Sequence, residues 1–184
     1  MRQALLALLL SLALPVSAAT QVLVSTSLGE FTVQLDEKNA PISSENFLRY
    51  VEDGSYVGTI FHRVIPGFMA QGGGFDQDFN RRDTYSPIKN ESANGLKNER
   101  ASIAMARTNA PDSATRQFYI NYNNNAFLDA RGNQPGYAVF GKVVKGFSVI
   151  EKMAEIPTTT VRSMGMKDVP LQPIVIKAIT IIKK

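Results

Sequence analysis

Few side chains in this sequence could carry covalent or metal chemistry. Its 184 residues include no cysteine and a single histidine, His62. Without cysteine, a disulfide, a thiolate nucleophile, an iron–sulfur cluster and a cysteine zinc site are excluded. A Ser-His-Asp triad or a zinc site would have to be built on His62. We therefore expect no metal and no cofactor, and an enzyme with this sequence should work by shape and fixed electrostatics.

The stretch FHRVIPGFMAQGGGF, residues 61–75, contains the most informative candidate site. It places one cation, Arg63, close in sequence to Phe68, Met69 and Gln71, with a Pro-Gly turn between them. A strand that leads through this turn could fold the apolar pair back beside the guanidinium. The result would be an apolar recess with one charged group on its rim. The alternative is that the apolar pair is ordinary core and Arg63 is a surface ion-pair partner.

His62 lies in the same stretch but has a different predicted role. In the predicted strand Thr59–Ile65 it alternates with Arg63, so the two side chains should point to opposite faces. With no second histidine and no cysteine in the chain, we interpret His62 as a structural imidazole with its hydrogen bonds satisfied; a catalytic imidazole is the alternative. The glycines at 72–74 are not followed by Gly-Lys-Ser/Thr and do not form a phosphate loop.

Two later segments could complete a cleft. In RQFYIN, residues 116–121, strand alternation places Gln117 and Tyr119 on one face and the intervening apolar residues on the other. One face could line the cleft while the other fills the core. The segment AFLDARGNQPGYAVFGKV, residues 126–143, offers Phe127 and Leu128 in a loop before a strand that begins beside Tyr137.

The elements that must position these residues are mostly short strands. Alternating apolar and polar residues predict strands at 21–26, 30–35, 59–65, 102–106, 117–121, 138–144 and 174–182. Helical periodicity predicts helices at 41–51, with Pro41 in the first turn, and at 147–155. Many strands with two helices favour a closed or nearly closed β structure. Long polar connections, which are often functional, are expected at 76–100, 107–116, 122–137 and 157–173.

Residues 1–18 have the pattern of a secretory signal peptide. Arg2 gives a positive start, Ala4–Leu14 is nearly all Ala and Leu, and small residues allow cleavage after Ala18 or Ala19. The apolar run is too short to span a membrane, and a buried core helix is the alternative interpretation. Residues 19–184 then form one exported domain without a membrane contact. Its basic residues are scattered rather than interleaved with aromatics, so we expect no nucleic acid partner. Nothing indicates an obligate interface, and we expect a monomer.

Together these segments resemble the cyclophilins, a family of peptidyl-prolyl cis–trans isomerases. The resemblance runs from about Val22 to Ile182 and is carried by FHRVIPGFMAQGGGF, SIAMAR, QFYIN and AFLDARGNQPGYAVFGKVVKG. PISSENFLRYVEDGSY, residues 41–56, is similar to the first helix of the family. With the predicted signal peptide, the chain resembles the periplasmic cyclophilins of Gram-negative bacteria.

The resemblance implies a fold, an activity and a set of site residues. The fold would be mainly β, a closed eight-stranded antiparallel barrel capped by two α-helices. The activity would be rotation about X-Pro bonds in unfolded or partly folded exported polypeptides, which assists their folding. The catalytic arginine falls on Arg63 and the glutamine that positions it on Gln71. The implied substrate-binding residues are Phe68, Met69, Ala106, Arg107, Gln117, Tyr119, Phe127, Leu128 and Tyr137.

Four positions depart from the best-known eukaryotic pattern. Phe127 replaces a tryptophan and its indole N–H, which implies weak binding of cyclosporin. Arg107 replaces an asparagine and adds a cation beside the substrate path. Tyr119 replaces a phenylalanine, and its hydroxyl must reach a partner or water. Tyr137 replaces a titratable histidine on the rim.

Two further functions remain open from the sequence. A domain of this fold could hold proline-containing clients without turning them over. A lipocalin-like carrier would enclose a ligand in the barrel, but it would need a roomy apolar interior. The bulky strand residues of this chain indicate a filled interior instead.

Overall fold

The computed structural model describes residues 19–183, so the predicted signal peptide at residues 1–18 lies outside the described residues. Strands, α-helices and two short 3₁₀ turns (η) alternate along this part of the chain. In chain order they are β1 Gln21–Thr26, β2 Gly29–Leu35, α1 Pro41–Glu52, β3 Thr59–Ile65, β4 Met69–Asp76, β5 Ser102–Met105, β6 Phe118–Asn121, η1 Ala126–Leu128, β7 Val139–Lys145, α2 Phe147–Glu155, β8 Thr158–Val161, η2 Arg162–Met164, β9 Met166–Pro170 and β10 Ile176–Lys183. Within residues 19–183, no helix has the length and apolar character needed to cross a membrane.

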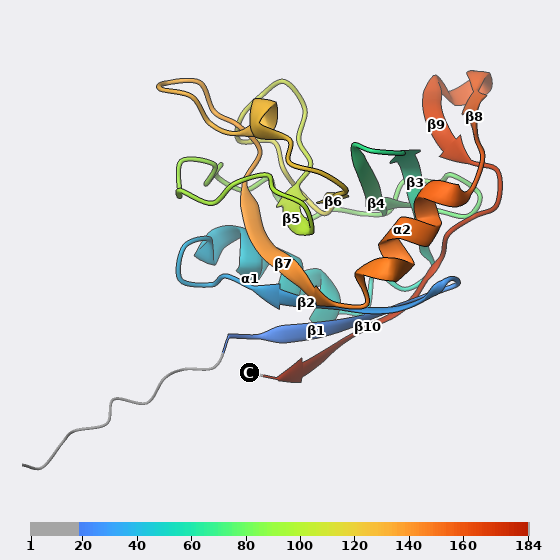
Figure 1. Cartoon of the computed structure of the whole chain (residues 1–184), viewed down its shortest axis with the longest axis horizontal. Helices are drawn as coiled ribbons and strands as arrows, with labels where there is room; N and C mark the ends of the chain where they lie inside the picture. Colours follow the sequence, from blue (N-terminus) through green and yellow to red (C-terminus); the bar gives the residue numbers. More distant parts are fainter. Residues whose placement is uncertain (1–18, 184) are drawn as a thin grey trace, which may run out of the picture.

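Eight strands form one strongly curled antiparallel sheet (Figure 1) in the order β10-β1-β2-β7-β5-β6-β4-β3. Its two edge strands meet only locally, through an isolated bridge between Ile60 and Val175. Two backbone hydrogen bonds, each 2.9 Å, run from Gly58 N–H to Ile176 O and from Phe61 N–H to Ile174 O.

The sheet is therefore a half-barrel rather than the closed barrel that we expected. The number of strands in the sheet and their antiparallel pairing are as predicted. The regular part of β10 begins only at Ile176. Pro173, shortly before it, has no N–H with which to extend a ladder toward β3.

Three strands were not recognised from the sequence pattern. β4 contains three consecutive glycines, which hide its alternation. Glycine is needed there, because a Cβ on Gly73 would lie 2.8 Å from the ring of Tyr56 and the backbone φ is +84°. β8 and β9 form a separate hairpin within the segment predicted to be an irregular loop. Figure 1 shows this hairpin standing beyond the curled sheet on the side of β3, and β9 packs against β3.

Both helices begin where the sequence predicts and cover the hydrophobic core. Phe47 of α1 packs its ring against Tyr56, Phe118 and Phe140 at centroid distances of 5.3 to 5.5 Å. The N-terminus of α1 lacks a side-chain cap of its own. Glu91 supplies it, since its carboxylate accepts hydrogen bonds from the backbone N–H groups of Ile42 (3.0 Å) and Ser43 (2.7 Å).

Candidate active site

A recess of about 240 Å³ opens beside β3, β4 and β6. Its lining residues are Arg63, Phe68, Met69, Gln71, Ala106, Arg107, Tyr119, Leu128 and Tyr137. All of them belong to the set that the sequence predicted. The two predicted residues outside the lining lie at its border. Gln117 accepts a hydrogen bond from Gln71, and the ring of Phe127 stacks on Phe68 with a centroid distance of 5.5 Å.

The apolar part of the recess is built on strand alternation. Met69 and Tyr119 are almost fully buried and pack with Ala104 and Val139, apart from the main core. The neighbouring Phe118 points the other way into the main core, as the alternation predicts. Phe127 lies at the outer rim and exposes 63% of its surface. The recess therefore has a buried apolar floor and an exposed aromatic edge.

The hydroxyl of Tyr119 finds the partner that its burial requires. It donates a 2.7 Å hydrogen bond to Oδ1 of Asn98, which also accepts from Nδ2 of Asn121 at 3.2 Å. Asn98 is held in turn by Asp129, whose Oδ1 accepts from the backbone N–H (2.8 Å) and from Nδ2 (3.0 Å) of Asn98. Burial raises the pKa of Tyr119 well above its ordinary value, so the phenol stays protonated and donates. The sequence contained no signal for Asn98, which lies in a long connection.

Arg63 and Gln71 are direct cross-strand partners in the β3–β4 ladder. The Nε atom of Arg63 lies 3.4 Å from Oδ2 of Asp168 in β9, and both side chains are partly exposed. Within residues 19–183, the two terminal guanidinium nitrogens have no hydrogen-bond partner. Arg63 thus lines the recess with its outer donors free.

Gln71 does not bond Arg63 in the manner that the resemblance implied. Its Nε2 donates to Oε1 of Gln117 at 2.8 Å, and Asp168 is the residue that bonds Arg63. The side chain of Gln117 in turn lies against Gly74. A Cβ added to Gly74 would come within 2.5 Å of Cγ of Gln117. Asp168 was missed because it lies 105 residues from Arg63, in a segment that we expected to be irregular.

The prediction that His62 and Arg63 point to opposite faces is wrong. The ladder steps from the pair Phe61–Gly72 to the pair Arg63–Gln71, so β3 has one extra residue, His62, at this point. This irregularity is a β-bulge, which redirects the side chains beside it. Both side chains line a second hollow next to the recess.

The imidazole of His62 is nevertheless deeply placed. It is 5% exposed and packs edge-on against the ring of Phe75 at 4.7 Å. Burial lowers the pKa of His62 to about 4; the backbone carbonyl of Ile60 acts in the opposite direction, and the nearby guanidinium groups of Arg63 and Arg81 lower the pKa further. The ring is therefore neutral at physiological pH.

Arg107 stabilises the opposite wall of the recess. Its guanidinium donates to the backbone carbonyls of Gly136 (3.0 Å), Pro135 (2.8 Å) and Thr108 (2.9 Å), and it lies 4.6 Å from the centroid of the Tyr137 ring. The added cation is thus bonded to the loop before β7, and its role includes holding Tyr137 on the rim.

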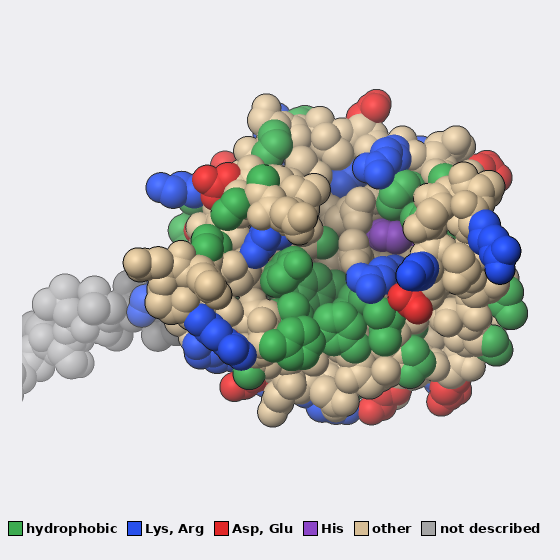
Figure 2. Space-filling model, turned by 90° about the horizontal axis from the view of Figure 1, so that it is seen from above, with side chains coloured by type: hydrophobic (Ala, Val, Ile, Leu, Met, Phe, Trp, Pro, Cys, Tyr) green, Lys and Arg blue, Asp and Glu red, His purple; other side chains and the backbone are tan. Residues whose placement is uncertain are grey.

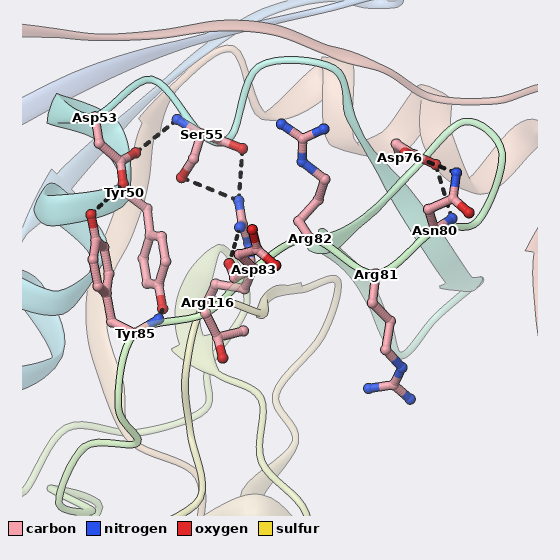
Figure 3. A pocket seen from close by; sticks show the side chains of 11 residues that line it. Tyr50, Asp53, Ser55, Asp76, Asn80, Arg81, Arg82, Asp83, Tyr85 and Arg116 are labelled. Carbon is pink, nitrogen blue, oxygen red and sulfur yellow. Dashed lines mark hydrogen bonds between the residues drawn. The ribbon is translucent and has the colours of Figure 1, made fainter.

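Arg116 forms the centre of a different hollow, of about 530 Å³, shown in Figure 3. The side chain of Arg116 is only 2% exposed. Its guanidinium donates hydrogen bonds to the backbone carbonyls of Gly73 (2.7 Å), Asp83 (2.5 Å) and Ser55 (2.7 Å). It also lies near the rings of Tyr50 and Tyr56, and burial lowers its pKa. Arg116 was not predicted. It ties three segments to the start of β6, directly before Gln117.

A curled antiparallel sheet with an arginine at the rim of an apolar recess matches one class of protein, the cyclophilin type of peptidyl-prolyl cis–trans isomerase. The model of the family described as "Cyclophilin type peptidyl-prolyl cis-trans isomerase/CLD" matches residues 21–181. The chain therefore belongs to this family and is a peptidyl-prolyl cis–trans isomerase.

Named relatives and solved structures agree with this assignment. The chain is 52% identical to peptidyl-prolyl cis-trans isomerase A of Dickeya dadantii, over 91% of this chain and 87% of that protein. It is 45% identical to peptidyl-prolyl cis-trans isomerase B of Escherichia coli, over 85% of this chain and 96% of that protein. A crystal structure of a cyclophilin type isomerase from Cryptosporidium parvum superposes with a TM-score of 0.74 at 26% identity, covering 91% of this chain and 99% of that one.

Proposed function

We propose that this protein is exported to the periplasm and accelerates rotation about X-Pro bonds in other exported polypeptides, which assists their folding. Its family membership supports the isomerase activity. The signal-like pattern at residues 1–18 supports the compartment. Uncatalysed X-Pro exchange takes tens to hundreds of seconds, so a folding chain gains from catalysis.

The reaction needs no nucleophile, because no bond is broken. Amide resonance gives the peptide bond a rotation barrier of about 18–20 kcal/mol. In the twisted transition state the proline nitrogen becomes pyramidal and regains a lone pair. A donor aimed at that nitrogen stabilises the twisted form more than either planar isomer, which is the requirement for acceleration.

Arg63 is our candidate for this donor. The observation that carries the proposal is its position on the lining of the apolar recess, with both terminal nitrogens free of other partners in residues 19–183. Arginine remains charged and presents several fixed donors. Phe68, Met69 and Leu128 would hold the proline ring on the apolar side. The carbonyl before the proline would then be free to swing.

The magnitude required is compatible with these groups. An acceleration of about five decades needs roughly 7 kcal/mol of transition-state stabilisation. One well-placed charged donor supplies about half of this amount, and substrate orientation supplies the rest. The paired amides of Gln71 and Gln117 are suited to orient the substrate backbone, because they border the recess as one hydrogen-bonded unit. The crystal structure of a related cyclophilin from Cryptosporidium parvum, 26% identical to this chain, was solved in the presence of the dipeptide Ala-Pro.

The test replaces Arg63 and follows exchange by NMR on a short Ala-Pro peptide. We expect Arg63→Ala to lower the exchange rate by a factor of roughly 100 or more, and Arg63→Lys to recover only part of it. Arg100→Ala is the matched control, because Arg100 is also a half-exposed arginine in an ion pair, with Glu151. Thermal unfolding of each variant checks the fold.

Two outcomes would contradict parts of the proposal. If Arg63→Ala folds and retains most of its activity, Arg63 is not the catalytic donor. If the wild type binds the peptide and does not exchange it, the protein is a holding module. The compartment is tested separately: a version lacking residues 1–18 should stay in the cytoplasmic fraction, and its appearance in the periplasmic fraction would contradict export.

A further inference from the structure

A second hollow of about 450 Å³ lies directly beside the proline recess and shares Arg63 with it. Its lining comes from β3, β4, the segment after β4, and the η2–β9 turn. The lining residues are His62, Arg63, Phe75, Arg81, Gln117, Met164, Gly165, Met166 and Lys167. Figure 2 shows the single histidine, in purple, in a hollow of the surface with blue cationic side chains at its edges. His62 and Arg63, whose side chains would alternate in a regular strand, both line this hollow at the position of the β-bulge in β3.

The charged residues that line the hollow are all cations. Arg63, Arg81 and Lys167 line it, and its lining contains no aspartate or glutamate. Arg81 and Lys167 are exposed, and neither forms an ion pair with any residue of the described range 19–183. Asp168, which follows Lys167 in the sequence, is bonded to Nε of Arg63. Two cations therefore border the hollow without a counter-charge.

One of the lining residues, His62, has a buried polar atom without a hydrogen-bond partner. Nδ1 of His62 is buried and has no hydrogen-bond partner among residues 19–183, although the side chain is only 5% exposed. Such atoms are uncommon in folded proteins and call for a partner. A neutral imidazole offers either one N–H or one lone pair at this nitrogen. A peptide amide, which has both a donor and an acceptor, can satisfy either form.

We propose that this hollow is a subsite for an aspartate or glutamate of the same polypeptide whose proline occupies the recess. The carboxylate binds between Arg81 and Lys167, and the adjoining peptide group lies over His62. The methionines of the η2–β9 turn, Met164 and Met166, contact the methylene groups of the acidic side chain. This inference rests on the proposed use of the recess as the proline site.

Geometry limits the acidic residue to the neighbourhood of the proline. Arg63 and the Gln71–Gln117 pair border both the recess and the hollow, so an extended peptide can pass from one to the other. An extended chain advances about 3.3 Å per residue. We therefore place the acid within three residues of the proline. The pairing is partly exposed, so its contribution should decrease at high salt.

The experiment measures kcat/KM on a set of peptides that contain one proline. Each peptide carries Glu, Gln or Lys at one of the three positions before or the three positions after that proline. We expect Glu to exceed Gln by roughly 5- to 10-fold at one position, and Lys to fall below Gln there. Raising the salt concentration to about 1 M should remove most of the difference. The charge-reversal variants Arg81→Glu and Lys167→Glu should invert the preference. Lys38→Glu, an exposed lysine outside the hollow, is the matched control and should preserve it.

The outcomes separate this inference from the proposed function. If the neutral peptide is turned over in an Arg63-dependent manner but Glu gives no advantage at any position, the subsite is wrong and the proposed function stands. If the Glu preference is unchanged in both Arg81→Glu and Lys167→Glu, the carboxylate binds elsewhere and the inference is overturned. Inorganic phosphate is the probe for a free anion. If millimolar phosphate inhibits the wild type and Arg81→Glu equally, and the wild type shows no preference for peptides with Glu, the inference is also overturned.

Discussion

The carboxylate of Asp168 lies 3.4 Å from Nε of Arg63 and bridges 105 residues of sequence. The backbone of Asp168 has a φ of +60°, a left-handed conformation that aspartate and asparagine tolerate better than most residues. Because both side chains are partly exposed, the pair contributes less than about 1 kcal/mol to stability. Its consequence should instead be the orientation of the guanidinium.

Asp168→Asn tests this role. Asparagine tolerates the left-handed backbone but lacks the charge, so we expect the fold to persist and kcat/KM on an Ala-Pro peptide to decrease roughly 3- to 10-fold. The measurement is peptide exchange together with a thermal melt. Glu151→Gln, which removes the partner of Arg100 in another surface pair, is the control and should leave kcat/KM unchanged. Full activity in Asp168→Asn would show that Arg63 needs no such orientation.

The stability of the protein should decrease in acid because of His62. Burial of the ring lowers its pKa to about 4 in the folded protein, from the ordinary histidine value of 6.5 that it has in the unfolded chain. Between these values the unfolded chain binds the proton and the folded protein does not, so the free energy of unfolding falls as the pH drops from 6.5 toward 4. A pKa difference of about 2.5 corresponds to roughly 3 kcal/mol.

Urea unfolding of the wild type and of His62→Gln at pH 7 and pH 4 isolates this contribution from that of the carboxylates. We expect the wild type to lose roughly 3 kcal/mol more than the variant between the two conditions. An equal loss in both proteins would mean that the imidazole is solvated in solution and that the hollow beside it is wider than described.

Replacement of Arg116 should weaken the fold. Arg116→Ala leaves the carbonyls of Gly73, Asp83 and Ser55 without their donor, and we expect the free energy of unfolding to fall by about 3 kcal/mol. The free energy of unfolding of Arg116→Lys should lie between that of the wild type and that of Arg116→Ala, because an ammonium group cannot reproduce the planar guanidinium fork. The exposed Arg162→Ala is the control, with a change within about 0.5 kcal/mol. A similarly small change in Arg116→Ala would contradict the structural role.

Cyclosporin should inhibit the wild type weakly and Phe127→Trp more strongly. The change restores an indole N–H at the position where the resemblance places a tryptophan. Phe127 is 63% exposed, so the larger ring fits without repacking the core. We expect the inhibition constant to fall by about tenfold or more, which is about 1.4 kcal/mol. Phe127→Leu is the control and should stay insensitive. Equal inhibition of all three proteins would show that the indole is not the limiting contact.

The recess was accessible to sequence reasoning because its parts are local. Arg63, Phe68, Met69 and Gln71 lie within nine residues of one another, and a strand, a Pro-Gly turn and a second strand bring them together. Of the other predicted residues, Arg107, Phe127, Leu128 and Tyr137 lie in long connections, where the family resemblance pointed to them, whereas Gln117 and Tyr119 lie in or next to β6. Periodicity determines which face such a residue occupies, and this information is present in the residue types themselves.

Residue alternation does not predict the positions at which the backbone departs from a regular strand. The glycines concealed β4, and the bulge at His62 moved a histidine expected on one face to the side of Arg63. The half-barrel likewise depends on where β10 becomes regular. A local pattern does not specify a bulge, because the extra residue is fixed by pairing with the neighbouring strand.

The sequence by itself determined both helices and most strands of the curled sheet, and its resemblance to the family pointed to the residues of the recess, including Arg63. Only the tertiary structure decided which polar groups meet: Asp168 with Arg63, Asn98 with Tyr119, and Arg116 with three carbonyls. Burial of apolar side chains follows from composition and period, and it acts without direction. A hydrogen bond needs a short donor–acceptor distance and near alignment, so its partners depend on how the sheet curls and where its long loops return.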